Sequence, residues 1–203
     1  MAGVRFPFLL RLLAPWVTWR YMAKRKVVYL TFDDGPIPES TPWTLDLLEE
    51  KGVKATFFCV GDNVRKYPNL YARILKQGHR VGNHSYNHIN GWASLTSNYI
   101  YNVDKAADLI DSNLFRPPQG LLRLAQAKRL SQRYKLIMWD VLSGDYRVDI
   151  TPEECLKRVV DYARPGSIIV FHNHVKSESN MRWVLPRAID ILRDRGYDFE
   201  LCD

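Results

Sequence analysis

Two adjacent aspartates, Asp33 and Asp34, and two histidines four residues apart, His84 and His88, give this 203-residue sequence its clearest chemical signal. Two imidazole nitrogens and one carboxylate oxygen make a three-ligand site with an open fourth position, which is the pattern of catalytic zinc. The spacing predicts both imidazoles on one side of a helical turn. Exposed loop histidines are the alternative. Because adjacent carboxylates repel each other unless a cation compensates, the paired aspartates favour a metal site.

Three further side chains could hold or move a proton beside such a metal. Neighbouring side chains at a strand end point in different directions, so one aspartate could bind the metal while the other takes a proton from a water molecule. His172 could protonate a leaving group, and a carboxylate such as Asp145 would raise its basicity. Arg116 could keep a basic aspartate ionised. These residues predict hydrolysis by a metal-activated water.

Short apolar runs alternate with amphipathic segments along the chain, and turn residues separate them. Strands are predicted at residues 27–32, 55–60, 79–82, 134–140, 167–171 and 197–202, with a short one ending at Phe115. Helices are predicted at residues 41–52, 63–77, 96–111, 121–132, 151–162 and 180–195. The alternation implies parallel strands in an α/β fold, either an incomplete (β/α) barrel or a doubly wound sheet. In both folds the catalytic residues follow the carboxyl ends of strands, where the candidate residues fall.

The candidate residues stand in five ordered segments that resemble the motifs of the polysaccharide deacetylase family, carbohydrate esterase family 4. The segments are residues 31–36 (TFDDGP), 84–88 (HSYNH), 115–118 (FRPP), 138–146 (MWDVLSGDY) and 170–172 (VFH). The resemblance covers nearly the whole chain from residue 27 onward. Five motifs in the expected order are far more specific than any one of them.

The resemblance implies a fold, a cofactor and a role for each candidate residue. The fold is a single distorted, incomplete (β/α) barrel of about seven parallel strands, formed by a catalytic domain at residues 27–203. The implied roles are general base for Asp33, metal ligand for Asp34, His84 and His88, general acid for His172, and orientation of the base and the acid for Arg116 and Asp145, respectively. The implied metal is divalent, with Zn²⁺ first and Co²⁺ or Ni²⁺ as alternatives.

The resemblance also implies a metal-dependent carbohydrate deacetylase that removes N-acetyl groups, with O-acetyl groups as an alternative, from a sugar polymer or oligosaccharide. Family members act on chitin, chitooligosaccharides, peptidoglycan or acetylated xylan. The predicted substrate groove consists of Pro118, Gln119, Tyr146, Val170 and Trp92.

The chain departs from the family motifs at a few positions. Gln119 replaces a tyrosine, Leu142 an aspartate, Tyr146 a tryptophan and Val170 a leucine. We interpret these changes as an altered substrate shape, because every proton-transfer and metal position is retained. A catalytically weak, deacetylase-like glycan-binding protein is the alternative hypothesis.

Residues 1–26 are predicted to form an apolar and basic arm that packs on the barrel. Arg11 interrupts the apolar run at residues 6–19 and no cleavage site follows it, so we predict neither a spanning helix nor an export signal. A cytoplasmic protein is expected, and peripheral contact of the arm with a membrane is the alternative.

The charged residues and the cysteines indicate which binding partners and which cysteine redox state to expect. The 29 lysines and arginines exceed the 22 aspartates and glutamates, but they are spread along the predicted helices. We therefore predict an acetylated oligo- or polysaccharide as the partner, and no nucleic acid. The three cysteines are far apart in sequence and are expected to be reduced. The protein is expected to be a monomer.

Overall fold

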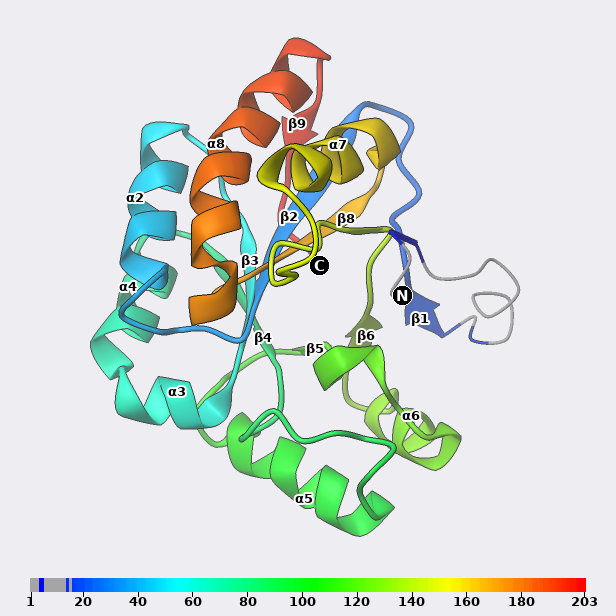
Figure 1. Cartoon of the computed structure of the whole chain (residues 1–203). Coiled ribbons are helices and arrows are strands. Elements are labelled where there is room, and N and C mark those ends of the chain that lie inside the picture. Colours follow the sequence, from blue (N-terminus) through cyan, green and yellow to red (C-terminus); the bar gives the residue numbers. More distant parts are fainter. Residues whose placement is uncertain (1–3, 6–13, 15) are drawn as a thin grey trace.

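The computed structural model describes Val4, Arg5, Ala14 and residues 16–203 (Figure 1). In this part of the chain, nine strands form a sheet in the order β1-β6-β5-β4-β3-β2-β8-β7, with β9 beside β2. The ladders between these strands are parallel. The strands are β1 (Val17–Thr18), β2 (Val27–Asp33), β3 (Thr56–Cys59), β4 (Arg80–Asn83), β5 (Leu114–Phe115), β6 (Lys135–Ile137), β7 (Val141–Leu142), β8 (Ile168–His172) and β9 (Asp198–Phe199). The arrangement confirms the predicted incomplete (β/α) barrel, with nine strands rather than about seven.

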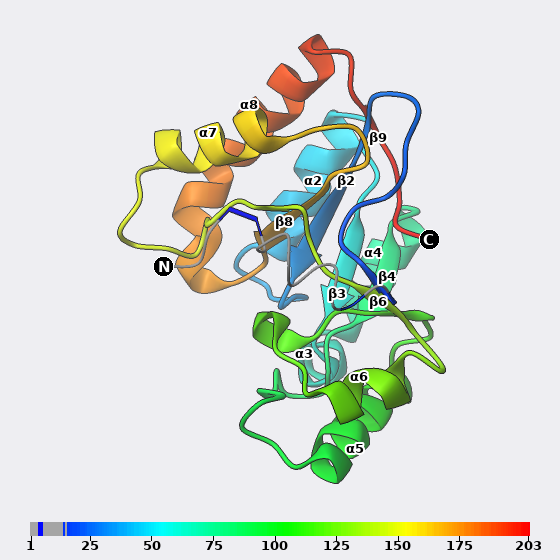
Figure 2. The same ribbon diagram turned by 90° about the vertical axis from the view of Figure 1, so that its right-hand side faces the viewer.

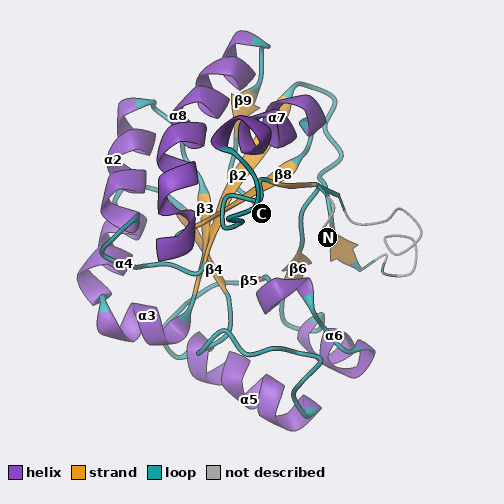
Figure 3. Cartoon of the chain, viewed as in Figure 1, coloured by secondary structure: helices purple, strands orange, loops and turns teal. Residues whose placement is uncertain are grey.

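Helices surround the strands as an outer layer (Figure 3). They are α2 (Thr41–Glu50), α3 (Gly61–Lys66), α4 (Pro68–Lys76), α5 (Thr96–Ala107), α6 (Leu124–Leu130), α7 (Pro152–Tyr162) and α8 (Glu178–Asp194), with the short 3₁₀ helices η1 (Pro118–Gly120) and η2 (Val175–Ser177). Figure 2 shows that α7 and α8 lie at one end of the molecule and α5 and α6 at the other. Because the helices cover the outside, the carboxyl ends of the strands remain available to build a site.

One predicted helix is two helices, and one predicted strand is shorter than expected. The helix predicted at residues 63–77 is divided at Tyr67, because Pro68 has no N–H with which to continue the helical hydrogen bonds. The strand predicted at residues 134–140 is only β6, which ends at Ile137; β7 follows at Val141–Leu142, toward the opposite edge of the sheet. Met138, Trp139 and Asp140 connect the two strands and cross the seam of the incomplete barrel.

The described residues of the predicted arm touch both sides of this seam. Val17 and Thr18 form β1 on the edge of β6, a strand that the sequence analysis does not predict. On the other side, the Leu142 N–H of β7 donates a 2.9 Å hydrogen bond to the Val4 carbonyl. Residues 6–13 and 15, on which the membrane-contact alternative partly depends, lie outside the described residues. Among the described helices, none has the length and apolar content needed to cross a membrane.

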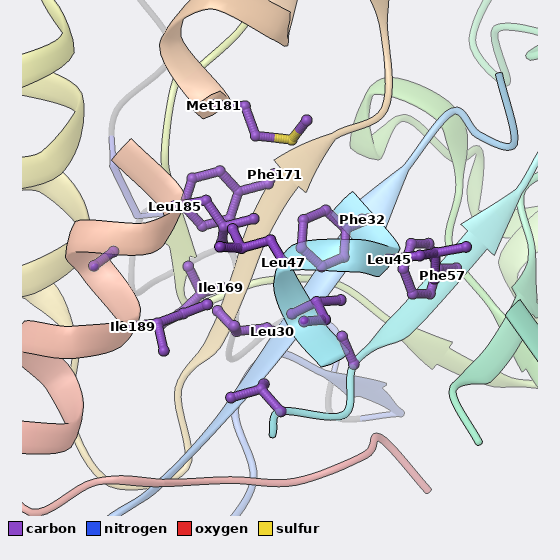
Figure 4. Close-up of a cluster of buried hydrophobic side chains, with 14 of the residues drawn as sticks. Leu30, Phe32, Leu45, Leu47, Phe57, Ile169, Phe171, Met181, Leu185 and Ile189 are labelled. Carbon is purple, nitrogen blue, oxygen red and sulfur yellow. The ribbon is translucent and has the colours of Figure 1, made fainter. Parts of the chain in front are cut away.

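One face of β2 and β8 builds the main core against the helices. The rings of Phe32 and Phe171 stack with 6.1 Å between centroids, and Met181 and Leu185 of α8 belong to the same buried cluster (Figure 4). Burying each large apolar side chain contributes roughly 1.5–3 kcal/mol. Because strand side chains alternate between the two faces, the other face carries the residues between them, which are Thr31, Asp33, Val170 and His172.

Candidate active site

Asp34, His84 and His88 bring three metal-ligating atoms together beyond the carboxyl ends of β2 and β4. Asp34 Oδ1 lies 3.2 Å from His88 Nε2 and 3.5 Å from His84 Nε2. Ligand atoms about 2.0–2.1 Å from a tetrahedral zinc ion are about 3.3 Å apart, so these distances suit a cation between them. Asp34 Oδ1 is also buried without a hydrogen-bond partner among the described residues. The donor set therefore fits a divalent metal ion.

A backbone contact fixes which nitrogen of His84 faces the other ligands. His84 Nδ1 lies 2.7 Å from the Arg116 carbonyl oxygen, which can only accept a hydrogen bond. The proton of a neutral His84 is therefore on Nδ1, and the lone pair of Nε2 faces Asp34. Metal-binding histidines commonly have this arrangement, in which the second nitrogen donates to a carbonyl group.

The two histidines lie in an irregular loop, so the predicted helical turn is wrong. Ser85 and His88 have left-handed backbone, with φ of 63° and 56°. Asn83 holds the loop, because its Oδ1 accepts a 2.8 Å hydrogen bond from the Ser85 N–H and its Nδ2 donates at 3.1 Å to the Val103 carbonyl of α5. Contacts with a distant helix therefore set the loop conformation, and these override the local preference for a helical turn.

Asp33 is the last residue of β2, and a buried arginine holds one of its oxygens. Arg116 Nη1 donates to Asp33 Oδ1 at 2.6 Å. The other guanidinium nitrogens donate to the carbonyls of Ile137 and Met138 at 3.2 and 3.0 Å, which fixes the orientation of Arg116. Asp33 Oδ2 makes no hydrogen bond to a described residue and lies 4.0 Å from His84 Nε2. Arg116 thus links the candidate base to the candidate metal ligands: its side chain contacts Asp33 and its backbone carbonyl contacts His84.

His172 ends β8 beside Asp33, since the two residues are register partners on neighbouring strands. The carboxylate of Asp145 accepts from the His172 backbone N–H at 2.7 Å and lies 2.8 Å from Nδ1. Burial disfavours the charged imidazole, but attraction and hydrogen bonding to Asp145 outweigh it and raise the pKa of His172 to about 9. His172 is therefore protonated at neutral pH. Because Asp145 engages Nδ1, Nε2 is the nitrogen that can donate a proton elsewhere.

Among the three candidate metal ligands, Asp34 and His88 have shifted pKa values. Burial opposes ionisation of Asp34, yet the imidazoles of His84 and His88 beside its carboxylate hold the pKa of that carboxyl well below the ordinary value. Burial also disfavours a charged His88, but attraction to the neighbouring Asp34 carboxylate outweighs burial and raises the pKa of His88. Asp34 is therefore ionised at neutral pH, as a metal ligand must be.

Tyr146 and Val170 of the predicted groove lie next to the His172 side of the site. The Tyr146 ring meets His172 edge-on, with 4.8 Å between ring centroids and 77° between planes. Val170, two residues before His172, is fully buried with Met138, Trp139 and Leu142. These residues make an apolar cluster beside the candidate proton donor.

The other three groove candidates lie around η1 and the loop before α5. Gln119 has a left-handed φ of 59° and accepts from Asn90 at 2.5 Å, while Pro118 is buried. Trp92 is 61% exposed, and its indole N–H donates at 3.1 Å to the Leu122 carbonyl. The contact anchors the Trp92 edge and leaves a large part of the side chain accessible.

Two asparagines that the sequence analysis does not single out hold the backbone of the aspartate pair. Asn63 Nδ2 donates at 2.7 Å to the Asp34 carbonyl, and the Asn173 N–H donates at 2.8 Å to the Asp33 carbonyl. Asparagine is common in loops, so residue type gives no signal for these contacts. Only the position of Asn173 directly after His172 could have drawn attention to it.

The parallel α/β barrel and its site define the class of the molecule. A carboxylate held by arginine, a histidine held by a second carboxylate, and an Asp-His-His set meet where hydrolases of this architecture build their active sites. The Polysaccharide deacetylase family model matches residues 20–136. The chain belongs to the polysaccharide deacetylase family, as the sequence motifs predict.

Similar proteins include both enzymes and a pseudoenzyme. A peptidoglycan-N-acetylglucosamine deacetylase of Bacillus cereus is 33% identical over 192 residues, covering 91% of this chain and 90% of that protein. The crystal structure of the Bc1960 peptidoglycan N-acetylglucosamine deacetylase, in complex with 4-naphthalen-1-yl-N-oxidanyl-benzamide, matches with a TM-score of 0.86 and 29% identity, covering 97% of this chain and 94% of that chain. A CE4 family pseudoenzyme from Bacillus anthracis matches with a TM-score of 0.78 and 27% identity, covering 90% and 66%.

Proposed function

We propose that this protein is a metal-dependent deacetylase that hydrolyses the acetamide of N-acetylated aminosugars in peptidoglycan. One observation carries the proposal: Asp33 and His172, register partners on β2 and β8, lie beside a set of three metal-ligating atoms. The similarity to peptidoglycan-N-acetylglucosamine deacetylases supports the substrate class.

Asp34, His84 and His88 would hold the cation, with Zn²⁺ first and Co²⁺ or Ni²⁺ as alternatives that suit the same donors. When bound, the cation supplies Lewis acidity toward a water molecule and the acetyl carbonyl group. Oδ2 of Asp33 is open and close to the ligand set, so it is placed to accept the proton of the attacking water. Arg116 holds that carboxylate in a fixed orientation through its hydrogen bond to Oδ1.

His172 has the complementary role. Its Nε2 donates a proton to the leaving nitrogen, so the products are acetate and a free amine. Asp145 keeps the imidazole oriented and charged until that step. Tyr146 and the cluster around Val170 would line the acetyl-binding side, and Pro118, Gln119 and Trp92 would contribute to the groove for the sugar chain.

Acetate release tests the proposal most directly. The substrates are peptidoglycan fragments, N-acetylated chitooligosaccharides and acetylated xylan, each with added Zn²⁺ or Co²⁺ and with a chelator control. We expect metal-dependent acetate release from the N-acetylated sugars, which a chelator abolishes and added metal restores. His84→Ala should lose both bound metal and activity. Acetate release that persists in the metal-free protein would overturn the metal role.

A glycan-binding role without turnover is the second candidate, because a pseudoenzyme shares this fold and four motif positions depart from the family pattern. Tight binding of an N-acetylated oligosaccharide with no acetate release, in a protein shown to contain metal, would favour that role. The cytoplasmic location, the monomeric state and the membrane contact of the arm remain predictions, which cell fractionation and light scattering of the full chain would test.

A further inference from the structure

Helix α5 holds the middle of the loop that carries the candidate metal ligands His84 and His88. Ser85 and His88 have left-handed backbone, with φ of 63° and 56°, which residues other than glycine adopt only where their surroundings favour it. The position of both imidazoles beside Asp34 therefore depends on contacts that keep the loop in this conformation.

Asn102 of α5 makes three hydrogen bonds with the two residues midway between the histidines. Its Oδ1 accepts from the Tyr86 N–H at 2.9 Å and from the Asn87 N–H at 3.4 Å. Backbone N–H groups can only donate, so the Asn102 oxygen faces them and its NH₂ faces the Asn87 side chain. There Nδ2 donates to Asn87 Oδ1 at 2.9 Å. One side-chain amide thus binds both the backbone and a side chain of the loop.

The carbonyl groups of the same loop are bound by α3. The Gly61 N–H donates to the Ser85 carbonyl at 2.9 Å, and the Asp62 N–H donates to the Tyr86 carbonyl at 2.8 Å. The first N–H groups of a helix have no partner inside the helix, so they are available for such contacts. Because the α3 contacts are made by backbone, the Asn102 side chain is the half of this clamp that a substitution can remove.

Order in the metal-free loop affects how tightly a cation binds. If the loop were mobile without metal, part of the binding free energy would be lost in ordering it, whereas ligands already in place avoid that cost. Groups that orient metal ligands change metal affinity by roughly 10- to 100-fold when they are removed. The hydrogen bonds of Asn102 go to Tyr86 and Asn87, so its effect on the ligands acts through the loop.

We propose that Asn102 is a positioning residue for the metal site, which keeps the loop between His84 and His88 ordered in the metal-free protein and so raises the affinity for a divalent cation. The inference rests on the proposed function, because it requires that Asp34, His84 and His88 bind the cation. It adds to that function a residue from a helix outside the segments that carry the ligands.

Three variants of the full chain separate the clamp from the helix that carries it. Asn102→Ala removes all three hydrogen bonds and should not weaken α5, because alanine has the highest helix propensity. Asn102→Asp keeps an acceptor for both N–H groups, and the Asn87 amide can turn its NH₂ toward the new carboxylate. Asn98→Ala, at an exposed position one turn earlier on α5, is the matched control.

The dissociation constant for Zn²⁺, measured by competition with a chromogenic chelator, is the main readout. We expect it to rise about 10-fold in Asn102→Ala, to stay within about threefold of the wild type in Asn102→Asp, and to be unchanged in Asn98→Ala. At saturating Zn²⁺, kcat of Asn102→Ala should return to within about twofold of the wild type, because the loss lies in metal affinity. A purely structural role would lower the melting temperature and leave the Zn²⁺ dissociation constant unchanged.

Amide hydrogen exchange of the metal-free protein tests the order of the loop without metal or substrate. The Tyr86 N–H should exchange about 10-fold faster in Asn102→Ala, the change expected from one lost hydrogen bond, and near the wild-type rate in Asn102→Asp. Equal exchange in the wild type and Asn102→Ala, or equal Zn²⁺ affinity of the two folded proteins, would overturn the inference. Failure to restore affinity in Asn102→Asp would also count against it.

The proposed function fails in a different way. In that case the wild-type protein would bind no divalent metal, or would bind it and release no acetate from any sugar. Zn²⁺ binding and acetate release in the wild type, together with unchanged Zn²⁺ affinity in Asn102→Ala, would overturn the role of Asn102 alone.

Discussion

The barrel contains two buried aspartates that pair with an arginine, Asp140 with Arg164 and Asp33 with Arg116. The two pairs differ in how many hydrogen bonds the carboxylate oxygens accept. Asp140 is fully buried, and Arg164 donates to both of its oxygens at 2.8 Å, while Ser167 adds a third hydrogen bond. Asp33 shares one oxygen with Arg116, and its Oδ2 has no hydrogen bond to a described residue. The first carboxylate is saturated, and the second has acceptor capacity to spare.

The difference indicates that the Asp140–Arg164 pair stabilises the fold, whereas the Asp33–Arg116 pair belongs to the candidate active site. Asp140 lies in the crossing between β6 and β7, where Arg5 of the arm also approaches it at 3.6 Å, so its partners tie together segments that close the barrel seam. Asp33 lies at the edge where the ligand set and His172 meet. A carboxylate can accept a proton from water only through an oxygen that other donors leave open. Asp33 satisfies this condition better than Asp140.

Of all substitutions in the two pairs, replacement of Asp33 should have the largest effect on acetate release. Asp33→Asn keeps the volume and removes the base, so we expect acetate release to fall about 10²- to 10⁴-fold. Metal content should stay the same, because Asp34, His84 and His88 are intact. Acetate release and bound metal, measured on the same sample, check the prediction. A wild-type rate would remove Asp33 from the mechanism.

Asp145→Asn should have a smaller effect that appears in the pH profile. In the wild type, the pKa of His172 is raised to about 9, so the proton donor is lost as pH rises through that value. Without the Asp145 charge this pKa is lower than in the wild type, because burial still disfavours the charged imidazole and attraction and hydrogen bonding to Asp145 no longer offset it. The basic limb of kcat/KM should therefore move to lower pH.

A profile between pH 6 and 10 measures that limb. Ser143→Ala is the matched control, because it removes a neutral donor to Asp145 and keeps the charge. An unmoved limb in folded Asp145→Asn would assign the proton transfer to a group other than His172.

The open edge of the barrel is predictable from sequence, whereas the saturated pair is not. Parallel strands bring their carboxyl ends to one edge, so Asp33 and His172 at the ends of apolar runs were placed correctly on that edge. The crossing between β6 and β7 has no local signal, since the sequence predicts one strand at residues 134–140 whereas β6 ends at Ile137. Long-range contacts decide it, including Arg164, which lies 24 residues from Asp140. The loop of His84 and His88 likewise depends on Asn83 and α5.

Asp140→Asn should reduce stability and leave chemistry nearly intact. The exchange removes the negative charge that pairs with Arg164. Because the Arg164 side chain is 42% exposed, water can solvate its guanidinium and offset part of the loss. We expect a loss of about 2 kcal/mol in the free energy of unfolding, within the range of a disrupted buried polar network. Denaturant titration measures the loss, and kcat/KM should change less than about twofold. A larger loss of activity than of stability would show that the seam also positions the site.

His79 extends the comparison to a buried titratable group with no charged partner. Its Nδ1 accepts from the Ala55 N–H at 3.2 Å, and its Nε2 has no partner among the described residues. Burial, with a smaller contribution from Lys54, lowers the pKa of His79 to about 4. The unfolded chain binds a proton near pH 6.5 and the folded chain does so only near pH 4, so stability should fall as pH decreases between these values.

The expected loss at pH 4 is about 2 kcal/mol, after allowing for partial screening. His79→Gln keeps an acceptor for the Ala55 N–H and cannot titrate, so it should flatten this part of the stability profile. Urea denaturation at pH 7, 5.5 and 4 of the two proteins makes the test. Parallel profiles would show that His79 gains a proton in the folded state as readily as in the unfolded state, and that burial alone does not keep it neutral. A flattened profile would separate this uncharged buried site from the two aspartates, Asp33 and Asp140, which accept hydrogen bonds from arginines.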